Sequence, residues 1–241
     1  MKSAELSNVA LITGSSSGIG EATARHFAKQ GYKVVVTGRD EARGKAVEQS
    51  IIAAGGQAAF YPAELSRESD AESLAAYAAN LGRLSVLVHC AGSNKPGMTF
   101  EDHIATNYKA PVFATRAALG HMSAGASIVM VTSICSESKR HHGGGPYADM
   151  KAATTSFVHG IAGELLSKGI RINIVAPGLT DTRDTQHISP KDRADNIARM
   201  PLVNDFLDPA EVAQTIYDVS MWRAVTGQTV IIDGGMTTCG E

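Results

Sequence analysis

Short apolar runs rich in β-branched residues recur along the chain, and longer segments of helical character separate them. Continuous apolar runs of this length are typical of strands that are buried on both faces, as in a parallel sheet. A further run, at residues 57–62, is a weaker strand candidate. The clear runs are VALIT (9–13), KVVVT (33–37), VLVHC (86–90), SIVMVT (127–132), IRINIVA (170–176) and TVIID (229–233).

Segments of helical length lie between these runs, at residues 19–30, 40–54, 66–80 and 146–167. Regular alternation of buried strands and helices predicts a doubly wound, Rossmann-type parallel sheet in a three-layer α/β/α arrangement. Because no long linker, repeat or low-complexity block interrupts the pattern, we predict a single domain over residues 1–241. The polar, proline-punctuated stretch at about residues 181–209 would lie beyond the carboxyl ends of the late strands, and we expect a substrate lid there.

Composition and charge restrict the class of function. The 22 Lys and Arg residues against 24 Asp and Glu residues leave a formal charge of −2, so no excess of positive charge indicates a nucleic acid or an anionic membrane. No apolar stretch approaches the roughly 18 residues of a membrane span, and the first residues lack a signal-peptide pattern. Cys90, Cys135 and Cys239 have no CxxC spacing, so neither a disulfide framework nor a zinc site is indicated. We therefore expect a cytoplasmic, globular protein that acts on a small molecule.

One stretch, TGSSSGIG at residues 13–20, contains three glycines in eight residues. It follows a predicted strand and opens a predicted helix, which is the context of a phosphate-binding turn. Glycine permits positive φ and close approach to a ligand, and a helix that begins near Gly18 directs unpaired N–H groups toward an anion. The stretch is not a P-loop, because Glu21 and Ala22 follow Gly20, and its spacing is not GxGxxG. By itself it is equally compatible with a tight turn that binds nothing.

A second group of residues has the chemistry of proton transfer. Tyr147 and Lys151 are four residues apart on a segment that Pro146 is suited to begin, so both side chains would share one helix face. An ammonium beside a phenol favours the phenolate, and we expect Lys151 to lower the pKa of Tyr147. Ser133 follows the strand at residues 127–132, and the return of the chain to the helix would bring its hydroxyl to the same pocket. The Tyr-x-x-x-Lys pattern alone is common and is also compatible with exposed, unreactive side chains.

The glycine stretch and the Ser133, Tyr147 and Lys151 group together resemble the classical short-chain dehydrogenase/reductase family. The resemblance extends over essentially the whole chain, with several motifs in the family's order. Its other elements are HCAG at 89–92 in place of the family's NNAG, Asn107 within a helix, APG at 176–178 and TGQTVIIDGG at 226–235.

This resemblance implies an oxidoreductase in which hydride passes between nicotinamide C4 and a substrate carbon. Tyr147 would exchange a proton with the substrate oxygen, and Ser133 would position that oxygen. Lys151 would tune Tyr147 and contact the nicotinamide ribose, and Asn107 would hold a water linked to Lys151. A helix asparagine could equally satisfy a backbone kink. The cofactor-binding residues implied are Gly14, Ser16, Ser17, Gly18, Ile19, Gly20, Arg39, Glu64, Leu65, Ala91, Gly92, Tyr147, Lys151, Pro177, Gly178, Thr180 and Thr182.

Several of these assignments have structural alternatives. Thr180 and Thr182, expected over the carboxamide end of the nicotinamide, could also be ordinary hydroxyls at a helix start. His89 and Cys90 replace the family's two asparagines, which leaves main-chain contacts with the cofactor possible and puts side-chain contacts in doubt. Cys135, two residues after Ser133, could lie near the pocket, although we favour a buried, inert thiol.

The loop between Ser133 and Tyr147 is one residue longer than the common family spacing, and we expect it to shape the substrate pocket. His141 and His142 lie on it and invite a metal-site interpretation. Two adjacent histidines are more often part of a solvated loop than of a metal site, so we interpret them as a solvated loop and predict no metal.

The cofactor expected from the sequence is NADP(H) rather than NAD(H). Gly38 stands where NAD-preferring relatives carry an acidic residue for the ribose hydroxyls, and Arg39 follows it with a side chain that could bind a 2′-phosphate. Asp40 is a counter-argument, although we predict that it caps the next helix. Glu64 stands near the family's Asp beside the adenine, and Leu65 would pack against that ring.

The leading functional hypothesis is an NADP-dependent carbonyl reductase or alcohol dehydrogenase. A 3-oxoacyl-thioester (acyl-carrier-protein) reductase is the alternative within enzymes, and a non-catalytic nucleotide-binding sensor or scaffold is the alternative of another class. Retention of Ser133, Tyr147 and Lys151 argues against the sensor. Lid residues including His187, Met200, Leu202 and Phe206 predict a partly apolar pocket.

We also expect a homo-oligomer, and by resemblance a homotetramer. Small residues on the long helix that begins near Tyr147 would let a second helix approach closely, unless they pack against the chain's own sheet. These residues are Ala152, Ala153, Ser156, Gly160 and Gly163.

Overall fold

A single parallel sheet organises the residues that the computed structural model describes, which are 7–136 and 145–238. Within them, seven strands have the order β3-β2-β1-β4-β5-β6-β7. They are β1 (Asn8–Thr13), β2 (Lys33–Gly38), β3 (Gln57–Pro62), β4 (Arg83–His89), β5 (Ser127–Val131), β6 (Arg171–Pro177) and β7 (Thr229–Ile232). The chain winds outward in opposite directions from β1 and β4, so a topological switch point lies between these strands, where ligands bind in such sheets. The predicted fold class is confirmed, including the weak strand at residues 57–62.

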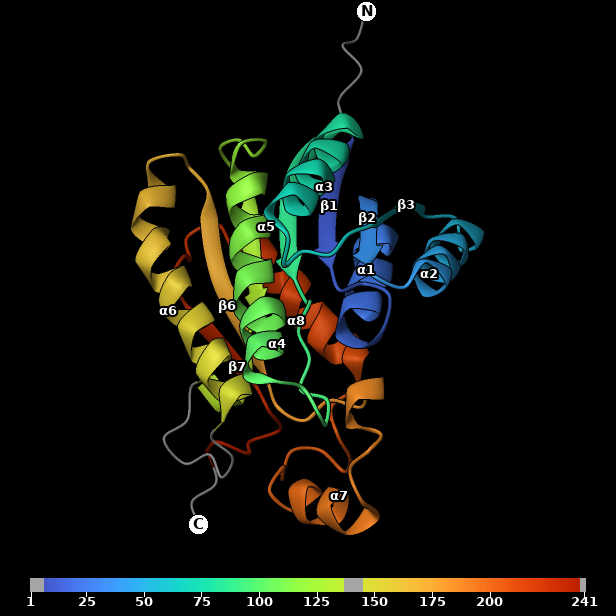
Figure 1. Ribbon diagram of the computed structural model, residues 1–241, viewed down its shortest axis with the longest axis vertical. Helices are drawn as coiled ribbons and strands as arrows, with labels where there is room; N and C mark the ends of the chain where they lie inside the picture. The colour runs from blue at the N-terminus through green and yellow to red at the C-terminus, as the bar shows by residue number, and fades with distance from the viewer. Residues whose placement is uncertain (1–6, 137–144, 239–241) are drawn as a thin grey trace, which may run out of the picture.

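Helices cover both faces of the sheet (Figure 1). One face is covered by α3 (Glu68–Asn80), α5 (Ala110–Leu119) and α6 (Pro146–Leu166), and the other by α1 (Gly18–Lys29), α2 (Glu41–Ala53) and α8 (Pro209–Met221). Shorter elements are α4 (Phe100–Ile104), the π-helical turn η1 (Ala105–Lys109), the 3-10 turns η2 (Ile134–Ser136) and η3 (Arg183–Thr185), and α7 (Pro190–Ile197). No helix among the described residues is long and apolar enough to cross a membrane.

The apolar runs form strands because the helices bury both of their faces. Every residue of β5 is buried, as are five of the six residues of β1. Two apolar clusters result, one on each side of the sheet. Burial on both faces removes the polar alternation of an exposed strand, and the sheet therefore forms a rigid frame whose carboxyl ends hold the loops in place.

Local signals set most helix ends, whereas α7 and α8 were not predicted. Asp40 caps α2, where its Oδ1 accepts from Arg43 N at 3.0 Å, and Pro146 is the first residue of α6, both as predicted. The predicted lid ends where α8 begins, with Asp208 as its N-cap and Pro209 as its first residue. That Asp-Pro pair is a helix start signal that the sequence analysis did not use. The helix expected around Asn107 is observed as α4, η1 and α5 in direct succession.

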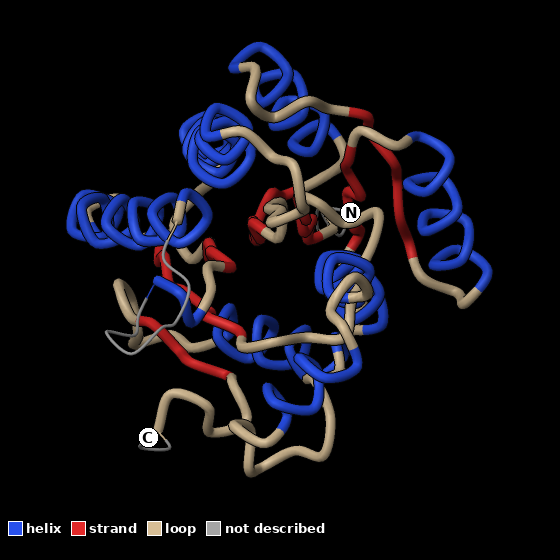
Figure 2. Tube along the Cα trace, turned by 60° about the horizontal axis from the view of Figure 1, so that its bottom comes forward, coloured by secondary structure: helices blue, strands red, loops and turns tan. Residues whose placement is uncertain are grey.

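The expected lid, residues 181–209, lies beyond the carboxyl ends of the strands (Figure 1). Figure 2, turned to bring this end forward, shows the strand ends at the centre of a ring of helices. The lid contains η3 and α7, and α7 has no buried residue. Two apolar side chains near its end, Met200 and Phe206, are buried in the cluster that contains α8. The lid is therefore anchored at its end and polar over α7.

Candidate active site

A cavity of about 500 Å³ lies at the carboxyl ends of the strands and beneath the lid. All but one of the residues predicted for the site line it. They are Gly14, Ser16, Ser17, Gly18, Ile19, Gly20, Arg39, Glu64, Leu65, Ala91, Gly92, Ser133, Tyr147, Lys151, Pro177, Gly178, Thr180 and Thr182. The exception is Asn107, which lies behind the cavity wall and is 1% exposed. The fold thus brings together two groups of residues that are more than a hundred positions apart in the chain.

The glycine turn between β1 and α1 has the geometry of an anion-binding loop. Gly14 and Gly18 have φ values of +65° and +57°, which only glycine adopts without strain. Ser17 caps α1 and makes no side-chain hydrogen bond to its first turn, so the first N–H groups of the helix remain available to a ligand.

Two buried hydroxyls support a polar ligand in the same cavity. Thr37 and Thr132 both line it, and among the described residues neither hydroxyl oxygen has a hydrogen-bond partner. Buried polar atoms are paired in most proteins, and an unpaired one inside a cavity indicates a ligand or solvent contact. The cavity therefore fits a ligand that is anionic at one end and rich in hydroxyl and amide groups, as a nicotinamide dinucleotide is.

Ser133, Tyr147 and Lys151 form one wall of the cavity. Ser133 follows β5, and its Oγ accepts a hydrogen bond from Cys135 N at 3.2 Å. Tyr147 and Lys151 lie one turn apart at the start of α6, and Lys151 Nζ is 5.7 Å from the centroid of the Tyr147 ring. Lys151 is buried, and its ammonium donates to Val131 O at 3.0 Å. The phenol and the serine hydroxyl are therefore positioned to contact one substrate oxygen.

The expectation that Lys151 lowers the pKa of Tyr147 is wrong for this structure. Burial raises the pKa of Tyr147 above its usual value, the nearby Cys135 and Asp184 raise it further, and a hydrogen bond with Ser133 opposes the rise. Burial acts on Lys151 as well and lowers its pKa to about 8. Burial thus disfavours both charged forms, the ammonium of Lys151 and the phenolate of Tyr147. Tyr147 remains protonated at neutral pH.

We expect Lys151→Met to stabilise the protein at pH 7, by about 1 to 2 kcal/mol. The folded-state pKa near 8 lies below the usual 10.5, so folding penalises the ammonium fully below pH 8, and the penalty disappears as the pH rises toward 10.5. Loss of the bond to Val131 O offsets part of the gain. Urea unfolding should show that Lys151→Met exceeds the unmodified protein in free energy of unfolding by less at pH 10 than at pH 7.

Lys168→Met is the matched control, because Lys168 is exposed and contacts only Glu164 at 3.8 Å among the described residues. The free energy of unfolding of Lys168→Met should differ little from that of the unmodified protein at either pH. A Lys151→Met protein that is less stable than the unmodified protein at pH 7 would contradict the burial argument.

The unusual pair His89 and Cys90 lies at the end of β4. His89 is 1% exposed, and its Nδ1 and Nε2 lie 3.5 and 2.9 Å from the hydroxyls of Thr13 and Thr115. Burial and the nearby Lys151 lower its pKa to about 3, so it is neutral at physiological pH. Cys90 lines the cavity, and burial raises its pKa to about 12. His89 is therefore a structural residue, and the Cys90 thiol is neutral and lies 3.9 Å from Thr23 Oγ1.

Asn107 holds the loop that follows β4. It lies in η1, and its Oδ1 accepts from Ser93 N at 3.0 Å while its Nδ2 donates to Ser93 O at 2.9 Å. The main-chain carbonyl of Asn107 accepts from Thr154 Oγ1 at 2.9 Å. Asn107 thus connects the loop wall of the cavity with α6.

Of the four lid residues expected at a partly apolar pocket, three do not line the cavity. Met200 and Phe206 are buried in the core cluster and Leu202 is 80% exposed, and only His187 lines the cavity. Met200 and Phe206 anchor the lid, and the lid residues that line the cavity are polar except for Ile188. The lid side chains on the cavity are Thr182, Arg183, Asp184, Thr185, His187, Ile188, Asn196 and Arg199.

The expectation that Cys135 is buried is wrong, whereas its position near the pocket agrees with the alternative. The residue is only partly buried, and it lines the cavity two positions after Ser133. The remaining expectations for this region cannot be compared, because His141, His142 and Cys239 lie outside the described residues.

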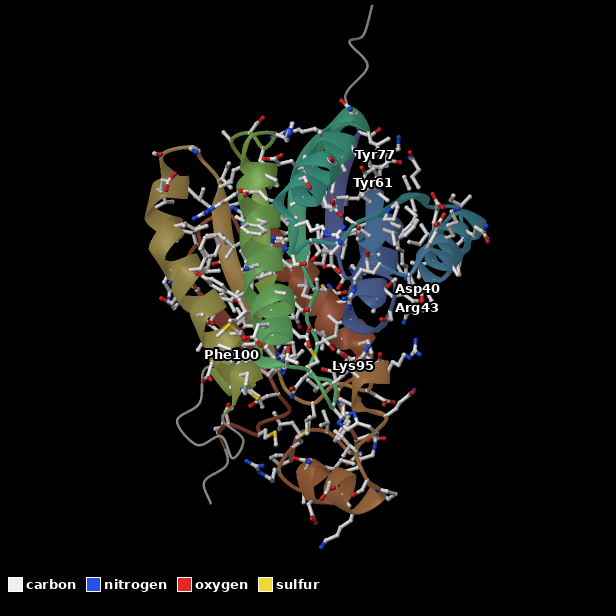
Figure 3. The ribbon with its side chains drawn as sticks, viewed as in Figure 1. Asp40, Arg43, Tyr61, Tyr77, Lys95 and Phe100 are labelled. Atoms are coloured by element: carbon white, nitrogen blue, oxygen red, sulfur yellow. The ribbon has the colours of Figure 1, made fainter. Side chains whose placement is uncertain are left out.

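The loop after β4 also contacts the lid. Ser93 Oγ donates to Asp184 Oδ2 at 3.2 Å, and Lys95 Nζ lies 3.7 Å from Asp184 Oδ1. Lys95 lies on this loop, at the end of the molecule that faces the lid (Figure 3). The sequence analysis missed these residues, because nothing in the local sequence pairs positions 93 and 184.

Charged residues surround the other end of the cavity, beside β2. Asp40 Oδ2 accepts from Arg43 Nε at 2.6 Å, and both side chains lie at the start of α2 (Figure 3). Arg39 is paired more loosely, with its Nη1 3.5 Å from Glu64 Oε2 and its side chain 66% exposed. The Asp40 carboxylate is therefore occupied within the chain, while the Arg39 guanidinium can reach an incoming anion.

Comparison with known proteins finds relatives over nearly the whole chain. The sequence profile described as enoyl-(acyl carrier protein) reductase matches residues 14–237. The chain is 30% identical over 241 residues to the human 3-oxoacyl-[acyl-carrier-protein] reductase, covering 96% of this chain and 98% of that protein. It is 31% identical over 242 residues to a 2,5-dichloro-2,5-cyclohexadiene-1,4-diol dehydrogenase of Sphingobium indicum, covering 94% and 95%.

Two solved structures show the same fold. A dehydrogenase/reductase from Sinorhizobium meliloti 1021 has a TM-score of 0.87 and 31% identity, with 96% of each chain covered. A short chain dehydrogenase from Burkholderia cenocepacia J2315, solved in complex with NADP, has a TM-score of 0.85 and 30% identity, with 94% and 96% covered.

Proposed function

The chain belongs to the classical short-chain dehydrogenase/reductase family, and we propose that it is an NADP-dependent carbonyl reductase or alcohol dehydrogenase. The family is one of oxidoreductases that act on CH–OH groups with a nicotinamide cofactor, so the sensor or scaffold hypothesis is set aside. One observation carries the proposal: Ser133, Tyr147 and Lys151 line the same cavity as the glycine turn and Arg39. When bound, the cofactor supplies the hydride through nicotinamide C4.

The residues of the chain supply proton transfer and orientation. Tyr147 donates a proton to the carbonyl oxygen in the reductive direction, and its raised pKa keeps it in the protonated form that this step needs. Ser133 donates a hydrogen bond to the same oxygen and fixes its position. Lys151 contacts the nicotinamide ribose and supplies positive charge beside Tyr147. The carbonyl of Asn107 has a lone pair beyond the one used by Thr154, and we propose that it holds a water linked to Lys151.

The preference for NADP(H) rests on the charges beside β2. Gly38 offers no carboxylate to a ribose 2′-hydroxyl, and the Asp40 carboxylate is already committed to Arg43 and the α2 N-terminus. Arg39 has only a loose partner in Glu64, so a 2′-phosphate would gain a charge-assisted contact. The solved neighbour in complex with NADP supports the same choice.

We expect Arg39→Ala to weaken NADPH binding by about 0.7 to 2 kcal/mol, roughly three- to thirty-fold in Kd. The Arg39 side chain is 66% exposed, so solvent screening keeps the effect below that of a buried contact. NADH has no 2′-phosphate and should bind equally well to both proteins. The measurement is the ratio of the NADPH and NADH dissociation constants, with Arg116→Ala as the control, because exposed Arg116 does not line the cavity.

Gly38→Asp should shift the same ratio toward NADH. Its carboxylate would accept from a free 2′-hydroxyl and repel a phosphate. A Cβ at Gly38 would lie 2.8 Å from Ser16 Oγ, which rotation of the serine side chain relieves. An unmodified protein that prefers NADH, or a ratio that neither substitution moves, would show that the assignment of NADP is wrong.

Reduction of a 3-oxoacyl thioester is the second candidate, and the names of curated relatives favour it. The polar lid lining does not favour it, because a long acyl chain needs an apolar wall. A panel of ketones, sugars and 3-oxoacyl thioesters, assayed for NADPH oxidation, tests both candidates. We expect the highest kcat/KM with a compact polar ketone. Turnover restricted to thioesters would replace the leading proposal by the second.

We propose that the protein is a cytoplasmic homo-oligomer, in which α6 forms a contact between copies. Ala152, Ser156, Gly160 and Gly163 are exposed on this helix, so these four do not pack against the chain's own sheet. A Cβ at Gly160 or Gly163 would meet no other atom of the described chain. Their spacing of three and four residues places them on one helix face, where a second helix could approach closely.

Light scattering at micromolar concentration should give about four times the chain mass of 25.2 kDa. Gly160→Glu should shift the mass toward smaller species, because a charged side chain would replace the close helix contact. A monomeric mass for the unmodified protein would refute the assembly.

A further inference from the structure

A buried histidine next to Tyr147 has no role in the proposal above. His103 lies in α4 and is 5% exposed. Its Nδ1 lies 3.2 Å from Asn107 Nδ2, and its ring packs edge-on toward Tyr147 with centroids 6.4 Å apart. His103 thus contacts Asn107, which holds the loop after β4, and lies beside the Tyr147 ring.

The hydrogen bonds of Asn107 determine what His103 does. Asn107 Oδ1 accepts from the main-chain N–H of Ser93, which can only donate, so the orientation of the amide is fixed. One Nδ2 proton goes to Ser93 O, and the other points at His103 Nδ1. His103 Nδ1 must therefore be an acceptor, which makes the imidazole neutral with its proton on Nε2.

The hydrogen bonds between Asn107 and Ser93 connect His103 with Lys151 and with the lid. A Cβ on Gly92 would lie 3.0 Å from Asn107 Oδ1 and 2.9 Å from Lys151 Nζ, so this backbone is held closely between the two side chains. Ser93 in turn donates through its hydroxyl to Asp184 of the lid. A rotation of the Asn107 amide would release Ser93 and loosen the contact of the loop with Lys151.

We propose that His103 is a positioning residue, whose Nδ1 holds the Asn107 amide and thereby fixes residues 91–93 against Lys151. The inference rests on the proposed function, because the group being positioned is the one assigned to proton transfer. Without the acceptor, one Asn107 N–H would be buried and unpaired, and turning the amide to satisfy it would break the Ser93 bonds. A small displacement of a reacting group lowers the rate more than it lowers ligand affinity.

The test compares His103→Asn with His103→Gln. An asparagine Oδ1 takes the position of His Nδ1, whereas the glutamine amide reaches the position of Nε2. We expect His103→Asn to keep kcat within about threefold of the unmodified protein, and His103→Gln to lose roughly ten- to a hundred-fold, with little change in the KM of the ketone or in NADPH Kd. Asparagine is the poorer helix former, so its rescue cannot come from helix propensity. Equal losses in the two variants would overturn the proposal.

A double-mutant cycle shows whether His103 acts through Asn107. In an Asn107→Ala background, His103→Gln should cause no further loss of kcat, because there is no amide left to orient. An additional loss as large as in the unmodified background would overturn the proposal.

A readout without turnover separates this inference from the proposed function. By NMR, the Asn107 side-chain amide protons should exchange slowly with solvent in the unmodified protein and in His103→Asn, and quickly in His103→Gln. If the unmodified protein reduces no carbonyl compound, the proposed function fails, and the exchange pattern still tests the hydrogen bond. Equal exchange in all three proteins would overturn the role of His103.

Discussion

Tyr147→Phe is expected to lower kcat for ketone reduction by roughly 10²- to 10⁴-fold, the range of general acid catalysis. The ring still fills its place, but the oxygen that gives the proton to the substrate is gone. NADPH affinity should stay nearly constant, because Lys151, the glycine turn and Arg39 are unaltered. The measurement is kcat by steady-state NADPH oxidation, with NADPH Kd from a separate titration.

The structure offers a matched control for this substitution. Tyr77 packs on Tyr61 with ring centroids 4.8 Å apart and does not line the cavity (Figure 3). Tyr77→Phe removes the same hydroxyl from a site without chemistry and should leave kcat unchanged. Substantial reduction by Tyr147→Phe would remove Tyr147 from the proton transfer, whereas a loss of NADPH affinity would show that the Tyr147 hydroxyl supports the cofactor site.

Gly20→Ala is expected to destabilise the fold by about 3 kcal/mol, at the upper end of the cost of overpacking. A Cβ at Gly20 would lie 2.3 Å from Gly14 O and 2.8 Å from Gly14 C. Both atoms belong to the main chain, so no side-chain rotation can relieve the clash and the glycine turn must open. The gain in helix propensity, about 1 kcal/mol for Gly to Ala, is too small to offset this.

Urea unfolding at a constant m value would measure the loss. Gly120→Ala is the control, because Gly120 is exposed at the end of α5, has a φ of −67°, and its added Cβ would lie no closer than 3.6 Å to another atom. Its stability should change by less than about 0.5 kcal/mol. Equal stability of Gly20→Ala and the unmodified protein would mean that the turn is not closely packed.

Much of the fold followed from the sequence, because its signals are local. Buried strands and helices differ in apolar periodicity, and each strand was recognised within a few residues of its observed bounds. Capping residues such as Asp40 and Pro146 act on their own helix, so they too were read correctly. The placement of the glycine turn and Ser133 on one cavity followed as well, because both come directly after strands whose carboxyl ends lie at the same edge of a parallel sheet.

The tertiary structure alone decided the properties that depend on burial and on distant partners. Tyr147 and Lys151 share a helix face as predicted, but the apolar surroundings, which sequence spacing cannot measure, raise the pKa of one and lower that of the other. Met200 and Phe206 face the core rather than the substrate, because burial against α8 stabilises apolar side chains more than contact with a polar cavity does. The link from His103 through Asn107 and Ser93 to Asp184 joins three segments of the chain. Its geometry exists only once the sheet has set the distances between them.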